Sequence, residues 1–257
     1  MQNRFALLLF SLIVFFSIGA TRVSAETPLF EYKILNIYPH DPAAYTQGLA
    51  LDGKTLYEGT GLHGKSTLRK VDLKTGKVVK QHKLPTDHFG EGITVVGDRI
   101  IQLTWQSRTG FVYHKNSFKL LQEFSYKTEG WGIAYDGSHL IMSDGTAFLQ
   151  FLDPKTFKPV RLIPVMEKDR LVPNLNELEY AEGEIYANVW GRDVIACISP
   201  QTGRVNGWID LSGLRKMLGT QHQAETMNGI AFNPEHKTFL VTGKHWPKLF
   251  EIRITKP

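Results

Sequence analysis

Five times along the chain, a short apolar segment is followed by a tight turn and a second apolar segment. The first segments lie at 47–51, 92–96, 132–135, 177–181 and 229–232. Short runs rich in β-branched and aromatic residues, joined by turns such as Asp52-Gly53 and Asp136-Gly137, are typical of β-hairpins. A second hairpin follows each of the first four, so each of these repeats predicts four strands.

The repeats are spaced by about 40 to 52 residues, which is close to the spacing of propeller blades. The fifth repeat ends after three strands, at 249–254, and a strand-like segment at 30–38 is left over. An incomplete blade would expose unpaired backbone groups at its edge. The predicted fold is therefore all-β: a five-bladed β-propeller whose last blade is closed by the N-terminal strand. The alternative is an open solenoid with a loose N-terminal arm.

Two longer connections interrupt the repeats, at 166–175 and 214–226. The second predicts a short helix with Leu214, Met217 and Leu218 on one side, because these residues have helical spacing.

Residues 1–25 have the features of a secretory signal peptide. Arg4 precedes a continuous apolar run at 5–18, and the small residues of Val23-Ser24-Ala25 suit a cleavage site. The run is too short for a comfortable membrane span, although an uncleaved anchor is the alternative. We therefore expect an exported protein, periplasmic or secreted, with the propeller domain at 26–257 and no membrane contact after processing.

The charge balance is evidence against a nucleic-acid partner, and the cysteine content is evidence against a reactive thiol. The chain has 30 Lys and Arg against 25 Asp and Glu residues, and without Arg4 and Arg22 of the leader the balance is 28 to 25, or +3. So even a balance, with no basic cluster, predicts no nucleic-acid partner. The one cysteine, Cys197, lies in an apolar strand and is expected to be a buried small hydrophobe.

At the start of the first strand of each repeat, one distinctive residue stands immediately before the glycine position. These residues are Gln47, Glu91, Trp131, Asn176 and Asn228. In the fourth repeat, Glu177 stands where the other repeats have glycine. The second strands end in Glu58-Gly59-Thr60, Thr104-Trp105, Ser143-Asp144, Asn188-Val189-Trp190 and Thr242-Gly243-Lys244-His245-Trp246. Because first strands line a propeller's axis and second strands return antiparallel, both sets are predicted at one mouth.

The residue types at this mouth suit a small polar ligand between aromatic walls. Other chemistries lack their motifs: there is no G-x-S-x-G turn for a serine hydrolase. The histidines have no zinc-binding spacing, and no glycine-rich phosphate loop is present. We therefore expect neither a metal nor an organic cofactor.

Together these motifs resemble the plant and bacterial type of glutaminyl cyclase. The resemblance extends over nearly all of the chain after the leader, and is carried by YTQGL, FGEGIT, LTW, EGWGIAYDG, NELEY…ANVW and MNGIAF…VTGKHWPKLFEI. It implies a metal-independent propeller enzyme that converts the N-terminal glutamine of peptides or proteins to pyroglutamate and releases ammonia. We also expect the protein to be a monomer.

The resemblance also implies roles for individual residues. Glu91 would be the catalytic acid/base, with Lys244 and Asn176 as polar catalytic groups. Residues that contact the substrate would be Gln47, Phe89, Trp105, Trp131 and Trp190; Asn228 joins them through its place in the repeat.

These groups match what the reaction requires. The substrate's α-amine attacks its own side-chain amide, so the enzyme must chiefly hold a folded substrate. It must also stabilise an oxyanion and protonate the departing nitrogen. Alternatively, Glu91 and Lys244 form a structural ion pair between blades, which would lower the pKa of Glu91.

Two other functions are compatible with the motifs. One is a non-catalytic propeller that binds peptide N-termini or another small polar ligand. The other is a calcium-dependent hydrolase or lactonase, which would need several carboxylates in the channel.

Overall fold

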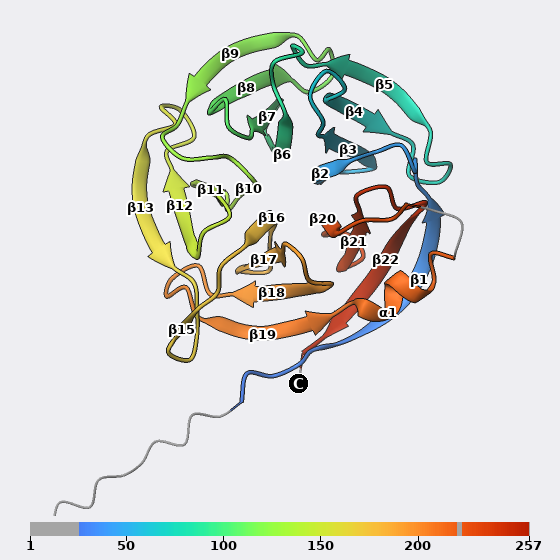
Figure 1. Ribbon diagram of the computed structural model, residues 1–257, viewed down its shortest axis with the longest axis vertical. Coiled ribbons are helices and arrows are strands. Elements are labelled where there is room, and N and C mark those ends of the chain that lie inside the picture. Colours follow the sequence, from blue (N-terminus) through green and yellow to red (C-terminus); the bar gives the residue numbers. More distant parts are fainter. Residues whose placement is uncertain (1–25, 220–222, 257) are drawn as a thin grey trace, which may run out of the picture.

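The computed structural model describes residues 26–219 and 223–256, so the leader predicted at 1–25 lies outside the described residues. Five four-stranded sheets surround one axis, as Figure 1 shows. Within each sheet, neighbouring strands are antiparallel. The predicted five-bladed β-propeller is confirmed.

Each blade runs from an inner strand at the axis to an outer strand at the rim. Blade I contains β2 (Thr46–Asp52), β3 (Thr55–Thr60), β4 (Thr67–Val71) and β5 (Val78–Lys83). Blade II contains β6 (Gly90–Val96), β7 (Arg99–Thr104), β8 (Thr109–His114) and β9 (Leu120–Ser125). Blade III contains β10 (Ile133–Tyr135), β11 (Leu140–Met142), β12 (Phe148–Leu152) and β13 (Pro159–Pro164). Blade IV contains β16 (Leu175–Ala181), β17 (Glu184–Val189), β18 (Val194–Ile198) and β19 (Val205–Asp210). Blade V contains β20 (Met227–Asn233), β21 (Thr238–Gly243), β22 (Lys248–Thr255) and β1 (Glu31–Pro39).

The two ends of the chain meet in blade V. Strand β1 pairs antiparallel with β22, from Glu31 opposite Thr255 to Pro39 opposite Lys248. The inner strands also contact one another in a closed cycle: β2 with β6, β6 with β10, β10 with β16, β16 with β20, and β20 with β2. The N-terminal strand therefore closes the ring as predicted, and the open solenoid is excluded.

The hydrophobic core is divided among the junctions between blades. Each of five buried clusters takes its residues from two neighbouring blades. Leu49 of blade I and Leu240 of blade V share one of them. Cys197 is buried in the cluster between blades IV and V, as predicted. Burial of apolar surface between blades thus holds the ring together.

The inner strands approach closely at the axis because of the glycines in the repeated motif. A Cβ on Gly92 would lie 2.7 Å from the Trp131 carbonyl oxygen, and one on Gly132 would lie 2.1 Å from that of Asn176. Blade IV has Glu177 at this glycine position, and its carboxylate accepts hydrogen bonds from neighbouring inner strands. Its Oε1 accepts the Leu49 N–H at 3.1 Å, and its Oε2 accepts the Ile230 N–H at 2.8 Å. One buried carboxylate therefore joins blades I, IV and V.

Two local features differ from the prediction. The connection before blade IV contains a small hairpin, β14 (Met166–Glu167) with β15 (Arg170–Leu171). The helix α1 (Ser212–Lys216) is present, but only Leu214 and Leu218 face the core, while Met217 is 40 % exposed. Met217 is the C-cap residue that ends α1.

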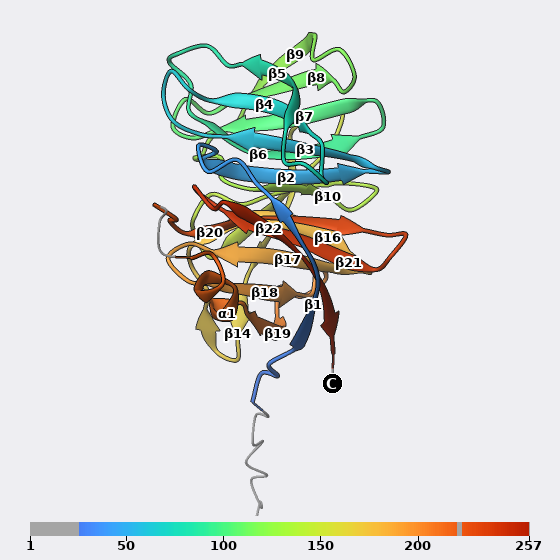
Figure 2. The ribbon, with the colours of Figure 1, turned by 90° about the vertical axis from the view of Figure 1, so that its right-hand side faces the viewer.

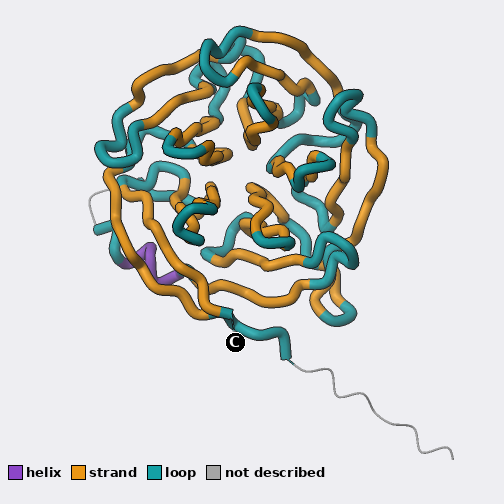
Figure 3. The backbone as a smooth tube through the Cα atoms, turned by 180° about the vertical axis from the view of Figure 1, so that it is seen from behind, coloured by secondary structure: helices purple, strands orange, loops and turns teal. Residues whose placement is uncertain are grey.

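Seen from the side, α1 and the β14–β15 hairpin lie at the end of the molecule where the inner strands begin (Figure 2). The view from behind shows α1 alone as helix, at the rim, among strands and loops (Figure 3). Within the described part of the chain, no helix is long and apolar enough to cross a membrane.

Candidate active site

A cavity of about 460 Å³ opens at the mouth where the inner strands begin. Its size is within the range of small-molecule sites. All five blades contribute to its lining: Tyr45, Gln47, Phe89, Glu91, Trp105, Trp131, Asn176, Trp190 and Lys244. The structure thus brings together eight of the nine site residues named from the sequence.

Irregular strand starts direct the polar side chains into this cavity. The register of the inner strands of blades I, II and IV shifts where Gln47, Glu91 and Asn176 stand. Such bulges turn a side chain away from the regular alternation of a strand. The repeated motif therefore encodes a bulge as well as a strand.

Glu91 lies in an unusual environment for a carboxyl group. Its side chain is buried, and the structure gives it no hydrogen bond or ion pair with a described residue. Burial raises the pKa of Glu91 well above its ordinary value; Lys244 opposes this rise and Glu129 adds to it. The protonated carboxylic acid is thus favoured. The structural ion pair considered above would instead lower this pKa.

Lys244 faces the same cavity from the end of β21. It is 4 % exposed, and its Nζ lies 4.7 Å from the centre of the Tyr45 ring. Burial lowers the pKa of Lys244, while the carboxyls of Glu91 and Glu225 act in the opposite direction. Its backbone is fixed by two hydrogen bonds, from Lys244 N to Thr226 O and from Glu225 N to Lys244 O.

The other polar lining groups are amides. Asn176 is 3 % exposed, and its Oδ1 is buried without a hydrogen-bond partner among the described residues. Leaving a buried acceptor unpaired costs about 1–3 kcal/mol, so this oxygen is suited to receive a donor from a ligand.

Asn228 does not line the cavity, in contrast to its predicted role as a substrate contact. It is fully buried, and its Nδ2 donates to Gln47 Oε1 at 3.0 Å and to Thr46 O at 3.2 Å. It therefore orients Gln47 from behind. Its strand has the same register shift, between Met227 and Ile230, so the repeat alone does not reveal that this side chain lies behind Gln47.

Aromatic rings form the walls. Phe89 packs edge-on against Trp105 at 5.6 Å and against Tyr45 at 6.0 Å, and Trp131 meets Trp190 at 6.2 Å. Trp190 is 48 % exposed at the entrance. Trp246, in contrast, is fully buried in the core between blades IV and V.

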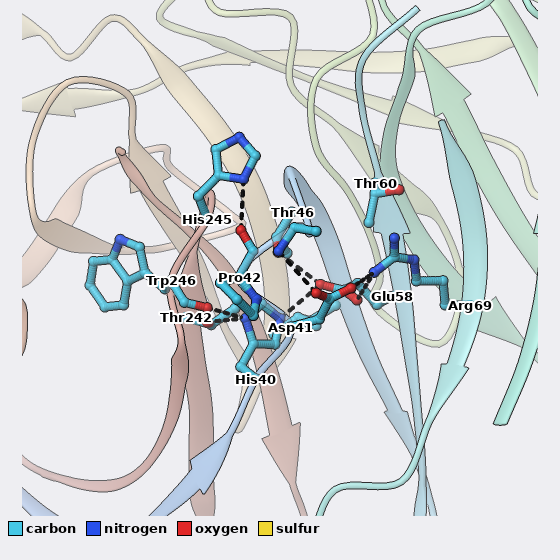
Figure 4. Close-up of polar contacts among 12 residues, drawn as sticks. His40, Asp41, Pro42, Thr46, Glu58, Thr60, Arg69, Thr242, His245 and Trp246 are labelled. Carbon is cyan, nitrogen blue, oxygen red and sulfur yellow. Dashed lines mark hydrogen bonds and ion pairs between the residues drawn. The ribbon is translucent and has the colours of Figure 1, made fainter. Parts of the chain in front are cut away.

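A buried ionic network lies beside the site (Figure 4). Glu58 Oε1 accepts hydrogen bonds from His40 Nε2 at 2.9 Å and from Thr46 Oγ1 at 2.7 Å. His40 Nδ1 lies 2.6 Å from the Trp246 carbonyl oxygen. Both ring nitrogens face acceptors, an arrangement that favours the imidazolium. Burial works against its charge, but Glu58, the Trp246 carbonyl and Asp41 together outweigh burial and raise the pKa of His40.

Arg69 completes this network. Its Nη1 donates to Asp41 Oδ2 at 2.9 Å and lies 3.6 Å from Glu58 Oε2. The network joins Thr46, next to Gln47, to Trp246, two residues beyond Lys244. Glu58 was expected at the mouth from its place at a strand end, but it is 1 % exposed and lies outside the cavity lining.

Sequence reasoning missed Tyr45 and Glu129 as parts of the site. Both lie inside the quoted motifs but just before the repeated residue, where no pattern marks them. Burial, and then the nearby Glu225, raise the pKa of Tyr45 to about 12. Glu129 accepts the indole N–H groups of Trp105 and Trp131.

Comparisons with known proteins agree on one family. The family model described as glutamine cyclotransferase matches residues 7–254. A glutaminyl-peptide cyclotransferase from Arabidopsis thaliana is 45 % identical over 228 residues, which cover 87 % of this chain and 71 % of that protein. The crystal structure of Myxococcus xanthus glutaminyl cyclase superimposes with a TM-score of 0.83 at 35 % identity, covering 88 % of this chain and 98 % of the other.

Proposed function

Because the chain belongs to the glutamine cyclotransferase family, we propose that it is a glutaminyl-peptide cyclotransferase that acts on peptides or proteins with an N-terminal glutamine. The observation that carries this proposal is the single cavity in which a buried acid, Glu91, meets a buried amine, Lys244, and an unpartnered amide, Asn176. The aromatic walls around them suit the aliphatic part of a glutamine side chain.

The reaction is intramolecular, so positioning supplies much of the rate. A free α-amine has a pKa of roughly 7.7–8.0, and a useful fraction is neutral near pH 7. The neutral amine attacks the carbon of its own side-chain amide and closes a five-membered ring. Negative charge then develops on the amide oxygen, and the amide nitrogen must leave as ammonia.

Glu91 acts first as an acid and then as a base. Its raised pKa favours the protonated form before the reaction. As the carbon–nitrogen bond breaks, Glu91 gives its proton to the leaving nitrogen. The resulting carboxylate takes the surplus proton from the former α-amine, which has become the ring nitrogen. Glu91 therefore ends protonated, and the products are pyroglutamyl peptide and ammonia.

Lys244 and Asn176 hold the reacting groups. The Lys244 ammonium supplies positive charge for the developing oxyanion. The unpartnered Asn176 oxygen accepts an N–H of the substrate, and Gln47, fixed by Asn228, adds a further polar contact.

The reaction as proposed needs no metal. It is carried by a carboxyl, an ammonium and amides, and the described residues include no group of three or more His, Cys, Asp and Glu placed to hold an ion. The calcium-dependent hydrolase requires such a group. We also propose that the enzyme is exported through its leader and works as a monomer.

The test uses protein without residues 1–25 and a short peptide that begins with glutamine. Mass spectrometry should show loss of one ammonia per peptide, with no change in the same peptide carrying an N-acetyl group, because the acetylated nitrogen cannot attack. Saturable binding without product would favour the non-catalytic propeller instead.

A further inference from the structure

Glu129 lies in the connection between β9 and β10, where the chain passes from blade II to blade III. It is partly buried and does not line the cavity. A single oxygen, Oε2, accepts the indole N–H of Trp105 at 2.7 Å and that of Trp131 at 2.9 Å. The two indoles belong to different blades, and both line the cavity.

We propose that Glu129 is a positioning residue: its carboxylate locks the indoles of Trp105 and Trp131 into one wall and places a second negative charge behind that wall, close to Glu91. The proposal rests on the proposed function for its catalytic consequence, but the contact with the indoles stands by itself.

The hydrogen bonds explain why a carboxylate is required here. An indole has one N–H donor and no acceptor, so each ring orientation depends on where that donor finds a partner. A charged acceptor makes roughly twice as strong a hydrogen bond as a neutral one. Gln106 Nε2 occupies the second oxygen, at 3.4 Å. Both carboxylate oxygens therefore have protein donors as partners.

The surroundings hold the connection in place. Gly130 N donates to Trp105 O, and Trp131 N donates to Ser143 O. A Cβ on Gly130 would lie 2.5 Å from the Tyr126 hydroxyl oxygen, so the chain passes close to blade II here. The ring of Trp131 also packs against Gly145. The carboxylate thus acts on rings whose backbones are already fixed.

The charge of Glu129 has a separate effect. Burial works to raise its pKa, but the hydrogen bonds from Trp131 and Trp105 outweigh burial and leave the pKa below its ordinary value, so Glu129 stays ionised. Its charge adds to the rise in the pKa of Glu91, which Lys244 opposes. Burial chiefly, and Glu91 in addition, raise the pKa of Tyr45 and the pKa of Tyr126. The pKa values of two neighbouring carboxyls are thereby shifted in opposite directions.

Three variants separate the two effects. E129Q keeps an oxygen acceptor of the same shape and removes the charge; E129A removes both. E123Q is the matched control, because Glu123 lies exposed on β9 of the same blade and its change alters the net charge equally.

The first measurement is the NMR spectrum of the indole N–H groups, with Trp105 and Trp131 assigned from W105F and W131F. E129A should move both resonances, E129Q should move both by less, and E123Q should move neither. Unmoved resonances in E129A would overturn the proposal, whether or not the protein cyclises glutamine.

The second measurement is ammonia release as a function of pH. E129A should lower kcat/KM by roughly 10–10²-fold through misplaced walls. E129Q should keep KM near that of the wild type, while the ionisation assigned to Glu91 moves to lower pH at unchanged thermal stability. A pH profile of E129Q that coincides with that of E123Q would overturn the electrostatic part. An inactive wild type would instead contradict the proposed function and leave the NMR result to decide on Glu129.

Discussion

Glu58 and Glu91 are two buried glutamates near the mouth of the propeller, and their surroundings are opposite. Glu58, on β3, is 1 % exposed, and Glu91, on β6, is 4 % exposed. Burial alone raises the pKa of both carboxyls. For Glu58, His40 and Arg69 more than offset burial and the pKa falls below its ordinary value. For Glu91 no hydrogen bond opposes burial, and the pKa rises.

The difference shows how one residue type serves two purposes in one fold. Glu58 has protein partners on both oxygens and fixes the junction of blades I and V. Glu91 is left without such partners at the place where a substrate would enter. A carboxyl kept this way costs stability, and that cost is typical of functional sites.

The largest difference between Glu91 and Glu58 should appear when each is replaced by glutamine. E91Q should lower kcat/KM for cyclisation by roughly 10²–10⁴-fold, because a neutral amide cannot carry the proton. Its unfolding free energy should equal or exceed that of the wild type, since a buried ionisable group without partners is gone. Full turnover by E91Q would contradict the role given to this residue; ammonia release and urea denaturation measure the two quantities.

E58Q should, in contrast to E91Q, lower the free energy of unfolding. Removing one partner of a buried ion pair typically costs about 3–5 kcal/mol, because His40 and Arg69 keep their charges. Urea denaturation of E58Q beside E91Q measures the difference. If E58Q were as stable as E91Q, the network of Figure 4 would not hold the blades together.

K244M tests the counter-charge of the site. Losing one donor to a developing oxyanion often lowers kcat by roughly 10²–10³-fold. Because Lys244 opposes the rise in the pKa of Glu91, the ionisation of Glu91 should also move to higher pH. The pH dependence of ammonia release tests both, with E123Q as a control that should match the wild type.

His40 should give stability a smaller dependence on pH. Its pKa is raised above the ordinary value of 6.5, so its contribution is present below pH 6.5 and is lost as the pH rises through the folded-state pKa. The difference in unfolding free energy between wild type and H40Q should therefore be constant below pH 6.5 and shrink above it. A difference that grows with pH would mean that His40 is neutral in the folded protein.

Chelation should have no effect at all. EDTA, removed by dialysis before assay, should leave kcat unchanged, because the proposed steps use only side chains of this chain. Loss of activity that returns with an added divalent cation would contradict the metal-free reaction.

The sequence was sufficient for the ring and for most of the cavity, because both follow from repetition. Once first strands converge on an axis, Gln47, Glu91, Trp131 and Asn176 must meet. Asn228 occupies the equivalent place and has the same bulge, yet it binds Gln47 and does not line the cavity, a difference that the repeat does not show. The β14–β15 hairpin failed because two-residue strands carry no periodic pattern.

The surroundings of a buried side chain were harder to predict than its position in the fold. Glu58 and Glu91 both stand at ends of strands near the mouth, and their motifs do not indicate which will be paired. The answer depends on His40, which precedes the first repeat, and on Glu129, which lies in a connection. Such segments lie outside the repeats, so no regular spacing in the sequence predicts their contacts.

The pairing of β1 with β22 also constrains the order in which this protein can mature. More than two hundred residues separate the two partners, so they join only after β22 has left the ribosome. Because Lys244 of blade V lines the cavity, a nascent chain that ends before this blade has an incomplete pocket. Blade V must therefore be synthesised before any turnover can begin.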